Sequence, residues 1–398
     1  MMHKNAIYLL LAIGLMTVGQ VPAGIYLPAV ITMSQYFHVS HGEIQYVVGI
    51  YLFFYGASQL IYGPLSDYFG RRFTVFLGLI IFCIGSIISI FSKNILFLYI
   101  GSIVQGMGLG SVAVVSMAIL RDLFNDKRLL NFTSYQSAAM IVTPLAAPVI
   151  GSYLLICFGW RAAFVFQLFY GIMVLLLSYR YLVEIRVKKS GGRFSIGQVM
   201  KNYKEVIRSK NFLEFGLCRV FIISGGTAYA ISAPFLYQGI LRLTPVQYAW
   251  LVILPALGFF VGSFLSKYFG KFNSIEQVLK IGIYISFFSC LLFLAWNSVF
   301  SVSLLSIMIP MLIYKVGSGI VFPSAIAGAI LPLGTLAGTA AALVGSIQNL
   351  GRGFFSTIVG VFYAGNIFPL AITMLLLSLL ALFVSFRFKA INGFHVSN

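Results

Sequence analysis

Two positive side chains lie in the middle of long apolar stretches of this sequence, Lys315 within 301–330 and Arg352 within 335–363. Placing a Lys or Arg at the centre of a membrane helix costs roughly 2.5–3.5 kcal/mol, so both should face a watery cavity and not lipid. All eight acidic residues lie at the ends of apolar stretches or between them. Because no carboxylate neutralises the two cations, we expect them to favour an anionic group on a ligand.

Other polar residues could line the same cavity. Gln348 and Asn349 recur with Arg352 at helical spacing, which predicts one hydrophilic stripe on that helix. Amide and phenol groups in other apolar stretches could add stacking and hydrogen bonds; they are Gln20, Tyr26, Tyr51, Tyr55, Gln136 and Tyr229. Two alternatives remain open: tyrosines near helix ends can be interface anchors, and the cations can bond to backbone carbonyls and only tune the cavity.

The sequence offers neither a catalytic constellation nor a metal site. The four histidines lie near the termini or between apolar stretches, and the four cysteines lie inside apolar stretches without paired spacing. A nucleotide-binding loop is also absent from the sequence, which argues against ATP as the energy source. We therefore expect no cofactor, and an intramembrane enzyme is the disfavoured alternative.

The composition explains what surrounds these residues. Of 398 residues, 60% are hydrophobic and only 9% are charged, which excludes a soluble globular domain. The apolar runs are too continuous for a β-barrel and predict an all-α integral membrane protein. Twelve transmembrane helices are expected near 6–34, 44–66, 73–92, 95–121, 129–157, 160–184, 212–240, 246–268, 279–297, 301–330, 335–363 and 366–390.

The basic residues predict the topology. Twenty of the 26 Lys and Arg residues fall between alternate spans on one side, and three fall on the other. By the positive-inside rule both termini are cytoplasmic, in an inner membrane of bacterial type. The longest polar stretch, 185–211, is predicted to be a cytoplasmic basic linker that lies against membrane lipids and contains a short helix near 196–207. The net charge of +18 is thereby explained without nucleic acid.

A short repeat divides the chain into two halves. The segment 65–72 reads LSDYFGRR and the segment 265–272 reads LSKYFGKF, so five of eight positions match. Each copy follows the second span of its half. Duplication of six helices is the simplest explanation, and it predicts pseudo-symmetric halves at 1–184 and 212–398.

Three motifs identify a family resemblance. The segment 63–72, GPLSDYFGRR, resembles the signature loop between helices two and three of the major facilitator superfamily. Gln105–Gly108 and Pro144–Gly151 resemble motifs of its twelve-helix drug:proton antiporter branch. One position departs from that pattern, because Ser102 stands where the branch usually has an arginine with a proton-relay role.

The resemblance assigns roles to the signature residues. Asp67 lies where it can pair with Arg71 or Arg72, and Asp122 is a second candidate partner. Such pairs would form a cytoplasmic latch, which implies a gating role for Gly63, Asp67, Gly70, Arg71, Arg72 and Asp122. The alternative is a charge cluster that only sets topology. Pro144, Pro148 and Gly151 would form the antiporter-type helix that controls leakage and exchange.

These observations predict a monomeric secondary transporter. It would export small organic compounds, as multidrug efflux proteins that confer antibiotic resistance do, by proton-coupled antiport and alternating access. The substrate would be anionic or amphiphilic. The alternative is a dedicated transporter of an anionic metabolite or a carboxylate siderophore, in either direction, and a channel is disfavoured because one chain already holds two halves.

Overall fold

The computed structural model describes residues 10–11, 13–123, 126–182, 196–362 and 366–387; within these ranges the side chains of 117–141, 196 and 335 lie outside the described set. The chain divides into two compact units, residues 1–199 and 200–398. Each unit is described by itself below. The finer division into halves and linker stays a prediction.

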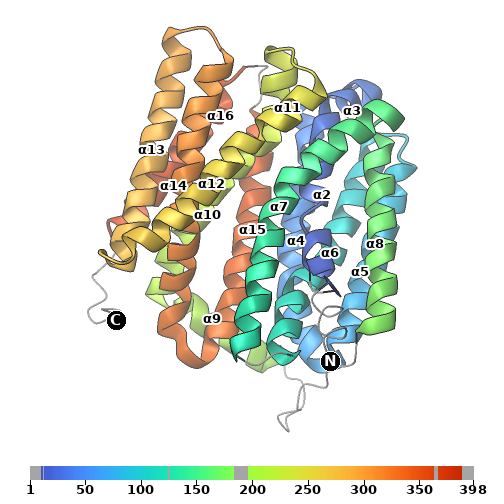
Figure 1. Cartoon of the computed structure of the whole chain (residues 1–398), viewed down its shortest axis with the longest axis vertical. Coiled ribbons are helices and arrows are strands. Elements are labelled where there is room, and N and C mark those ends of the chain that lie inside the picture. Colours follow the sequence, from blue (N-terminus) through green and yellow to red (C-terminus); the bar gives the residue numbers. More distant parts are fainter. Residues whose placement is uncertain (1–9, 12, 124–125, 183–195, 363–365, 388–398) are drawn as a thin grey trace. The chain divides into compact units, whose positions relative to one another are not determined.

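The first unit is a bundle of helices (Figure 1). Its elements are α2 (Pro22–Ile25), the 3-10 turn η1 (Leu27–Ala29), α3 (Val30–Phe37), α4 (His41–Phe69), α5 (Arg71–Ile90), α6 (Ile95–Leu123), α7 (Asp126–Phe158) and α8 (Arg161–Tyr181). Helix α9 (Ile196–Arg208) crosses the boundary between the units.

The second unit is also helical throughout its described residues. Its elements are α10 (Lys210–Pro234), the π-helical turn η2 (Phe235–Ile240), α11 (Pro245–Leu251), α12 (Ile253–Phe269), α13 (Ile275–Val299), α14 (Leu304–Ile330), the 3-10 turn η3 (Leu331–Leu336), α15 (Ala337–Val361) and α16 (Phe368–Ser385). Capping boxes fix several starts, such as Ser274 with Gln277 at α13.

Nine helical segments among the described residues are long and apolar enough to cross a membrane. Helix α15 is not one of them, since it carries the predicted polar stripe. The first predicted span, 6–34, was wrong as one continuous helix: it turns at Gly19–Val21, and Pro22 and Pro28 begin new short helical pieces. The eighth breaks at Val252, because Pro255 cannot donate to the carbonyl of Leu251.

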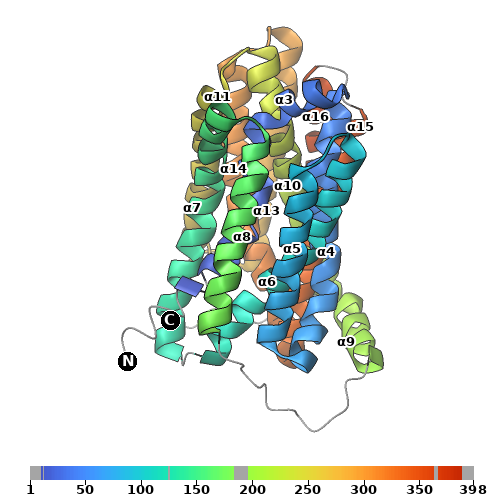
Figure 2. The ribbon, with the colours of Figure 1, turned by 90° about the vertical axis from the view of Figure 1, so that its right-hand side faces the viewer.

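The same pattern of helix packing recurs in both units. Helix α6 packs on α4 and α5, and α14 packs on α12 and α13; α5 also packs on α8, as α13 packs on α16. The first helical pieces contact α7, just as α10 contacts α15. Figures 1 and 2 show α4, α5 and α6 side by side in both views. The repeat predicted from two short turns is therefore present in the packing of whole helices.

Glycines at matched places in the two units allow neighbouring helices to approach closely. A Cβ on Gly108 of α6 would lie 2.5 Å from the carbonyl oxygen of Gly78 in α5, and one on Gly317 of α14 would lie 2.7 Å from that of Gly282 in α13. Small residues allow such contacts between membrane helices.

We predict that Gly317→Ala lowers thermal stability in detergent. The new methyl group would meet the Gly282 carbonyl and Ser286, and overpacking of this kind costs about 1–3 kcal/mol. Gly216→Ala in α10 is the matched control, because no described heavy atom lies within 4 Å of its Cβ position. The unfolding midpoint of the control should stay level or rise; equal loss in both variants would contradict the packing argument.

Candidate functional site

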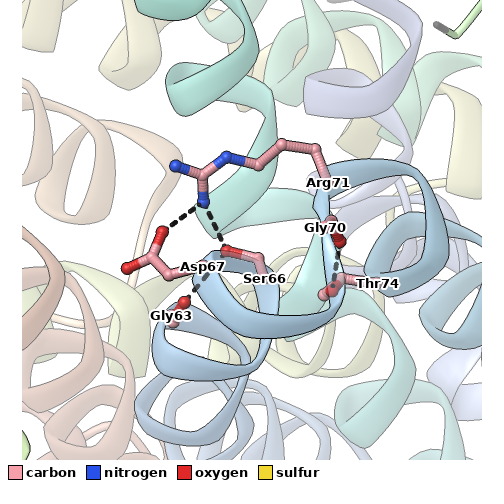
Figure 3. Close-up of polar contacts among 6 residues, drawn as sticks. All are labelled: Gly63, Ser66, Asp67, Gly70, Arg71 and Thr74. Carbon is pink, nitrogen blue, oxygen red and sulfur yellow. Dashed lines mark hydrogen bonds and ion pairs between the residues drawn. The ribbon is translucent and has the colours of Figure 1, made fainter. Parts of the chain in front are cut away.

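The signature loop forms a tight turn between α4 and α5. Gly70 separates the two helices alone, with φ 97° and ψ 158°, a backbone conformation that favours glycine. Its carbonyl oxygen accepts a hydrogen bond of 2.9 Å from the Thr74 hydroxyl (Figure 3). The Ser66 hydroxyl donates to the Gly63 carbonyl at 2.9 Å. These bonds fix the ends of both helices at the loop.

The side chain of Arg71, at the start of α5, bonds back across this turn to the end of α4. Its Nη1 lies 2.8 Å from Asp67 Oδ1 and also donates to the Ser66 hydroxyl (Figure 3). Arg71 is 4% exposed, whereas the Asp67 side chain is 65% exposed. A pair with one solvated member contributes about 1 kcal/mol or less. Such a contact can hold a conformation and still break readily.

Arg72 makes a different set of contacts. Its Nη2 donates 3.1 Å to the carbonyl oxygen of Tyr179 at the end of α8, and its guanidinium lies over the rings of Phe76 and Tyr179. The two arginines of the signature therefore have different partners. Arg71 bonds to Ser66 and Asp67, and Arg72 connects α5 to α8.

The second copy of the motif has another structure. Gly270 takes a right-handed φ of −63°, and a longer turn follows before Ser274 caps α13. Lys267 stands where the first copy has Asp67, and Phe272 where it has Arg72. The aspartate–arginine pair is thus a feature of the first unit alone in sequence.

The antiporter-type helix α7 packs closely on the first helical pieces. A Cβ on Gly151 would collide with the carbonyl oxygen of Ile25, and one on Gly24 would lie 3.7 Å from Pro148 Cδ. Pro148 is buried and Pro144 is exposed, both inside a helix that runs without a break. Close packing explains Gly151 and Pro148 but not Pro144.

The predicted tyrosines of the first unit are buried within it. Tyr51 and Tyr55 stack with ring centroids 5.9 Å apart, and the Tyr51 hydroxyl donates 3.2 Å to the Gly19 carbonyl beside half-buried Gln20. Tyr26 stacks on Phe164, and its hydroxyl, buried, has no hydrogen-bond partner among the described residues. Tyr51, Tyr55 and Gln20 therefore gather at the break in the first span.

A polar network replaces the missing arginine of α6. Ser102 bonds to its own helix at Leu98, while Gln105 Nε2 donates 2.9 Å to both the Ser86 hydroxyl and Gln167 Oε1. This network joins α5, α6 and α8 and carries no charge. Our sequence analysis missed Ser86 and Gln167, although an amide inside the apolar sixth span was a usable signal.

A cation cluster, Arg219, Lys315 and Arg352, lies within the second unit. Arg219 of α10 is 5% exposed; its Nε donates to Gln348 Oε1 on α15, and its guanidinium lies 4.1 Å from the centroid of the Phe322 ring. Arg219 lies only seven residues into the apolar stretch 212–240, but the amide of Gln348 and the ring of Phe322 hold its side chain inside.

The other two cations lie beside it on α14 and α15. Arg352 Nε donates 2.9 Å to the Thr227 hydroxyl, and its Nη1 donates 3.1 Å to Asn349 Oδ1. Lys315 Nζ donates 3.1 Å to the Gly226 carbonyl. Both side chains are half-buried, and Arg352 repels both Arg219 and Lys315 electrostatically.

The charge balance of this cluster is one-sided. From residue 212 to 398 the sequence contains only two carboxylates, Glu214 and Glu276. Glu214 pairs with Lys210 at 3.7 Å, and Glu276 lies in the first turn of α13. The cations donate hydrogen bonds to side-chain amides, a hydroxyl and a backbone carbonyl, which orient positive charge without cancelling it.

The structure does not gather every predicted residue. Tyr229 is buried, and its hydroxyl lies 3.0 Å from that of Tyr237, in an aromatic group with Tyr248. The side chains of Asp122 and Gln136 lie outside the described residues. The second-unit site therefore consists of the cation cluster with Gln348, Asn349 and Thr227.

Helical bundles that repeat their packing and carry polar groups among apolar helices are typical of membrane transporters. The family model described as Major Facilitator Superfamily matches residues 9–356. The chain belongs to this superfamily. The predictions of an all-α membrane protein with the major facilitator fold, and of a transporter in place of an enzyme, are confirmed.

Among the proteins similar to this chain are two that are named for drug resistance. The chain is 31% identical over 360 residues to multidrug resistance protein D of Escherichia coli, with 89% of each chain covered. It is 23% identical to a bicyclomycin resistance protein homolog of Haemophilus influenzae, with 94% of each covered. The xylose transporter XylE of E. coli, in a partially occluded inward-open conformation, shares the fold with a TM-score of 0.74 at 15% identity over the whole of both chains.

Two tyrosines of the first unit give a matched stability test. Tyr26→Phe removes a buried hydroxyl without a partner, so its melting temperature should be equal or higher. Tyr51→Phe removes the bond to the Gly19 carbonyl and should cost about 1 kcal/mol. Thermal unfolding of the purified variants measures both. A loss confined to Tyr26→Phe would contradict the assignment of these hydroxyls.

Proposed function

We propose that this transporter exports small organic compounds of the multidrug type, and that its substrates carry an anionic group. The first part rests on relatives whose names record multidrug and bicyclomycin resistance. The second part rests on one observation, the cation cluster held by neutral partners in residues 212–398, which contain only two glutamates.

The accessibility of the three cations suggests different roles. Lys315 and Arg352 are half-buried, so an anionic group can approach them. Arg219 is enclosed by Gln348 and Phe322 and acts as a positioning residue that adds positive potential. Gln348 and Asn349 each accept from a guanidinium, which fixes the direction of both. An anion held this way gains charge-assisted hydrogen bonds at preorganised donors.

Proton-coupled antiport by alternating access is the transport mode that we propose. The proton gradient would supply the energy, without a bound cofactor or ATP. Asp67 and Arg71 would act as a latch, because an ion pair with an exposed carboxylate is weak enough to open in each cycle. The close contact of α7 with the first helical pieces would limit leakage.

The transporter would act as a monomer in the inner membrane, with both termini cytoplasmic and lipids as its neighbours. A dedicated carrier of an anionic metabolite or carboxylate siderophore would use the same cation cluster. A substrate panel separates the two, since a dedicated carrier accepts one compound and excludes its relatives.

The experiment compares wild type with Arg352→Gln and Lys315→Gln in everted membrane vesicles. The probes are aromatic carboxylates and their uncharged primary amides. Loss of one charged partner from a desolvated pair costs about 2–5 kcal/mol, so KM for the carboxylates should rise at least tenfold, with little change for the amides. Lys267→Gln, exposed in the last turn of α12, is the control. Unchanged KM for a transported carboxylate would refute the anionic preference.

The latch is tested by Asp67→Asn against Lys267→Asn at the equivalent position of the repeat. A protonophore should abolish transport by wild-type vesicles, and Asp67→Asn should slow turnover several-fold without changing KM, because the ion pair does not touch substrate. Lys267→Asn should behave as wild type. Transport that persists without a pH gradient would contradict antiport, and an unaltered rate in Asp67→Asn would contradict the latch.

A further inference from the structure

Helix α9 has two chemically distinct faces beside each other. Lys201, Lys204 and Arg208 are three and four residues apart and share one face, and all three are exposed. Met200 and Ile207 are seven residues apart and lie next to that face; they are 60% and 42% exposed. A basic edge beside exposed apolar side chains is the pattern of helices that lie in a membrane interface.

The opposite apolar edge of α9 is already occupied. Val206 is fully buried, and its carbonyl oxygen accepts a hydrogen bond of 3.1 Å from the amide of Ser209. The helix therefore rests on the protein through Val206 and turns Met200 and Ile207 outward. The burial of Val206 does not extend to the edge that carries Met200 and Ile207.

The short connection to α10 places one end of α9 near the membrane surface. Ser209 alone separates Arg208 from Lys210, and the Ser209 hydroxyl caps α10 by accepting from Phe212. The segment Lys210–Ile240 is a candidate membrane span, so its first residues lie at a boundary between lipid and water. Figure 2 shows α9 as a separate short helix before the start of α10. The end of α9 at Arg208 therefore lies close to that boundary.

We propose that the face of α9 formed by Met200, Lys201, Lys204, Ile207 and Arg208 binds anionic phospholipid. The apolar pair inserts among the acyl chains, and the three basic side chains bind phosphate oxygens of the headgroups. Glu205 is the one acidic residue of the helix and is also exposed, so it opposes binding. Positive charge on this edge matches a lipid surface of negative charge. This site is separate from the cation cluster and does not depend on what is transported.

The test uses the full chain with a nitroxide label at Ile207→Cys, in a background without Cys83, Cys157, Cys218 and Cys290. The protein is placed in nanodiscs of phosphatidylcholine alone or with phosphatidylglycerol. Collision with lipid-soluble oxygen is compared with collision with a water-soluble nickel chelate. We expect phosphatidylglycerol to shift the label toward oxygen, and K201Q/K204Q/R208Q to abolish the shift, since each basic residue contributes about fivefold in partitioning.

Two controls keep the result specific. Glu205→Gln, which removes the opposing charge, should strengthen the shift, and a label at position 205 should stay accessible to nickel in both nanodiscs. Equal accessibility of label 207 in both lipid compositions would overturn the proposal. So would a label shielded from both reagents in lipid-free detergent, because that result means that a protein segment covers the face.

Discussion

Positive charge is costly among apolar helices, and the second unit holds three positive side chains there. The surrounding residues follow from this constraint: Gln348, Asn349 and Thr227 supply oxygens to the guanidiniums, and the ring of Phe322 covers Arg219. Neutral acceptors satisfy the N–H donors, but they leave the net charge in place. A ligand that brings negative charge is the simplest way to complete the site.

The two units carry out different chemistry on one architecture. Their helices pack in the same pairs, yet their polar groups differ: the first unit buries a neutral network of Ser86, Gln105 and Gln167 among α5, α6 and α8, whereas the second holds cations on α10, α14 and α15. The signature loop shows the same divergence. Its ion pair with Asp67 occurs in the first copy, while Lys267 occupies that position in the second. The packing recurs in both units, whereas the polar residues differ.

Sequence patterns predicted the helices well, because apolar length decides membrane spans. They singled out Lys315 and Arg352 by their depth, and they offered Arg71 or Arg72 as the partner of Asp67. Sequence patterns did not predict features that depend on local geometry, such as the direction of a side chain or a break within a span. Arg219 lies near the start of its apolar stretch, and only the position of Gln348 on a neighbouring helix shows why it stays inside. The broken first span likewise depended on how Pro22 and Pro28 act together.

Ligand affinity measures directly whether the cation cluster selects an anionic group. Binding of a transported aromatic carboxylate and of its primary amide to the purified wild-type protein should be compared by calorimetry at two salt concentrations. We expect the carboxylate to bind at least about tenfold tighter, which corresponds to about 1.4 kcal/mol, and the half-buried cations to preserve most of this difference at high salt. Equal or tighter binding of the amide would contradict it.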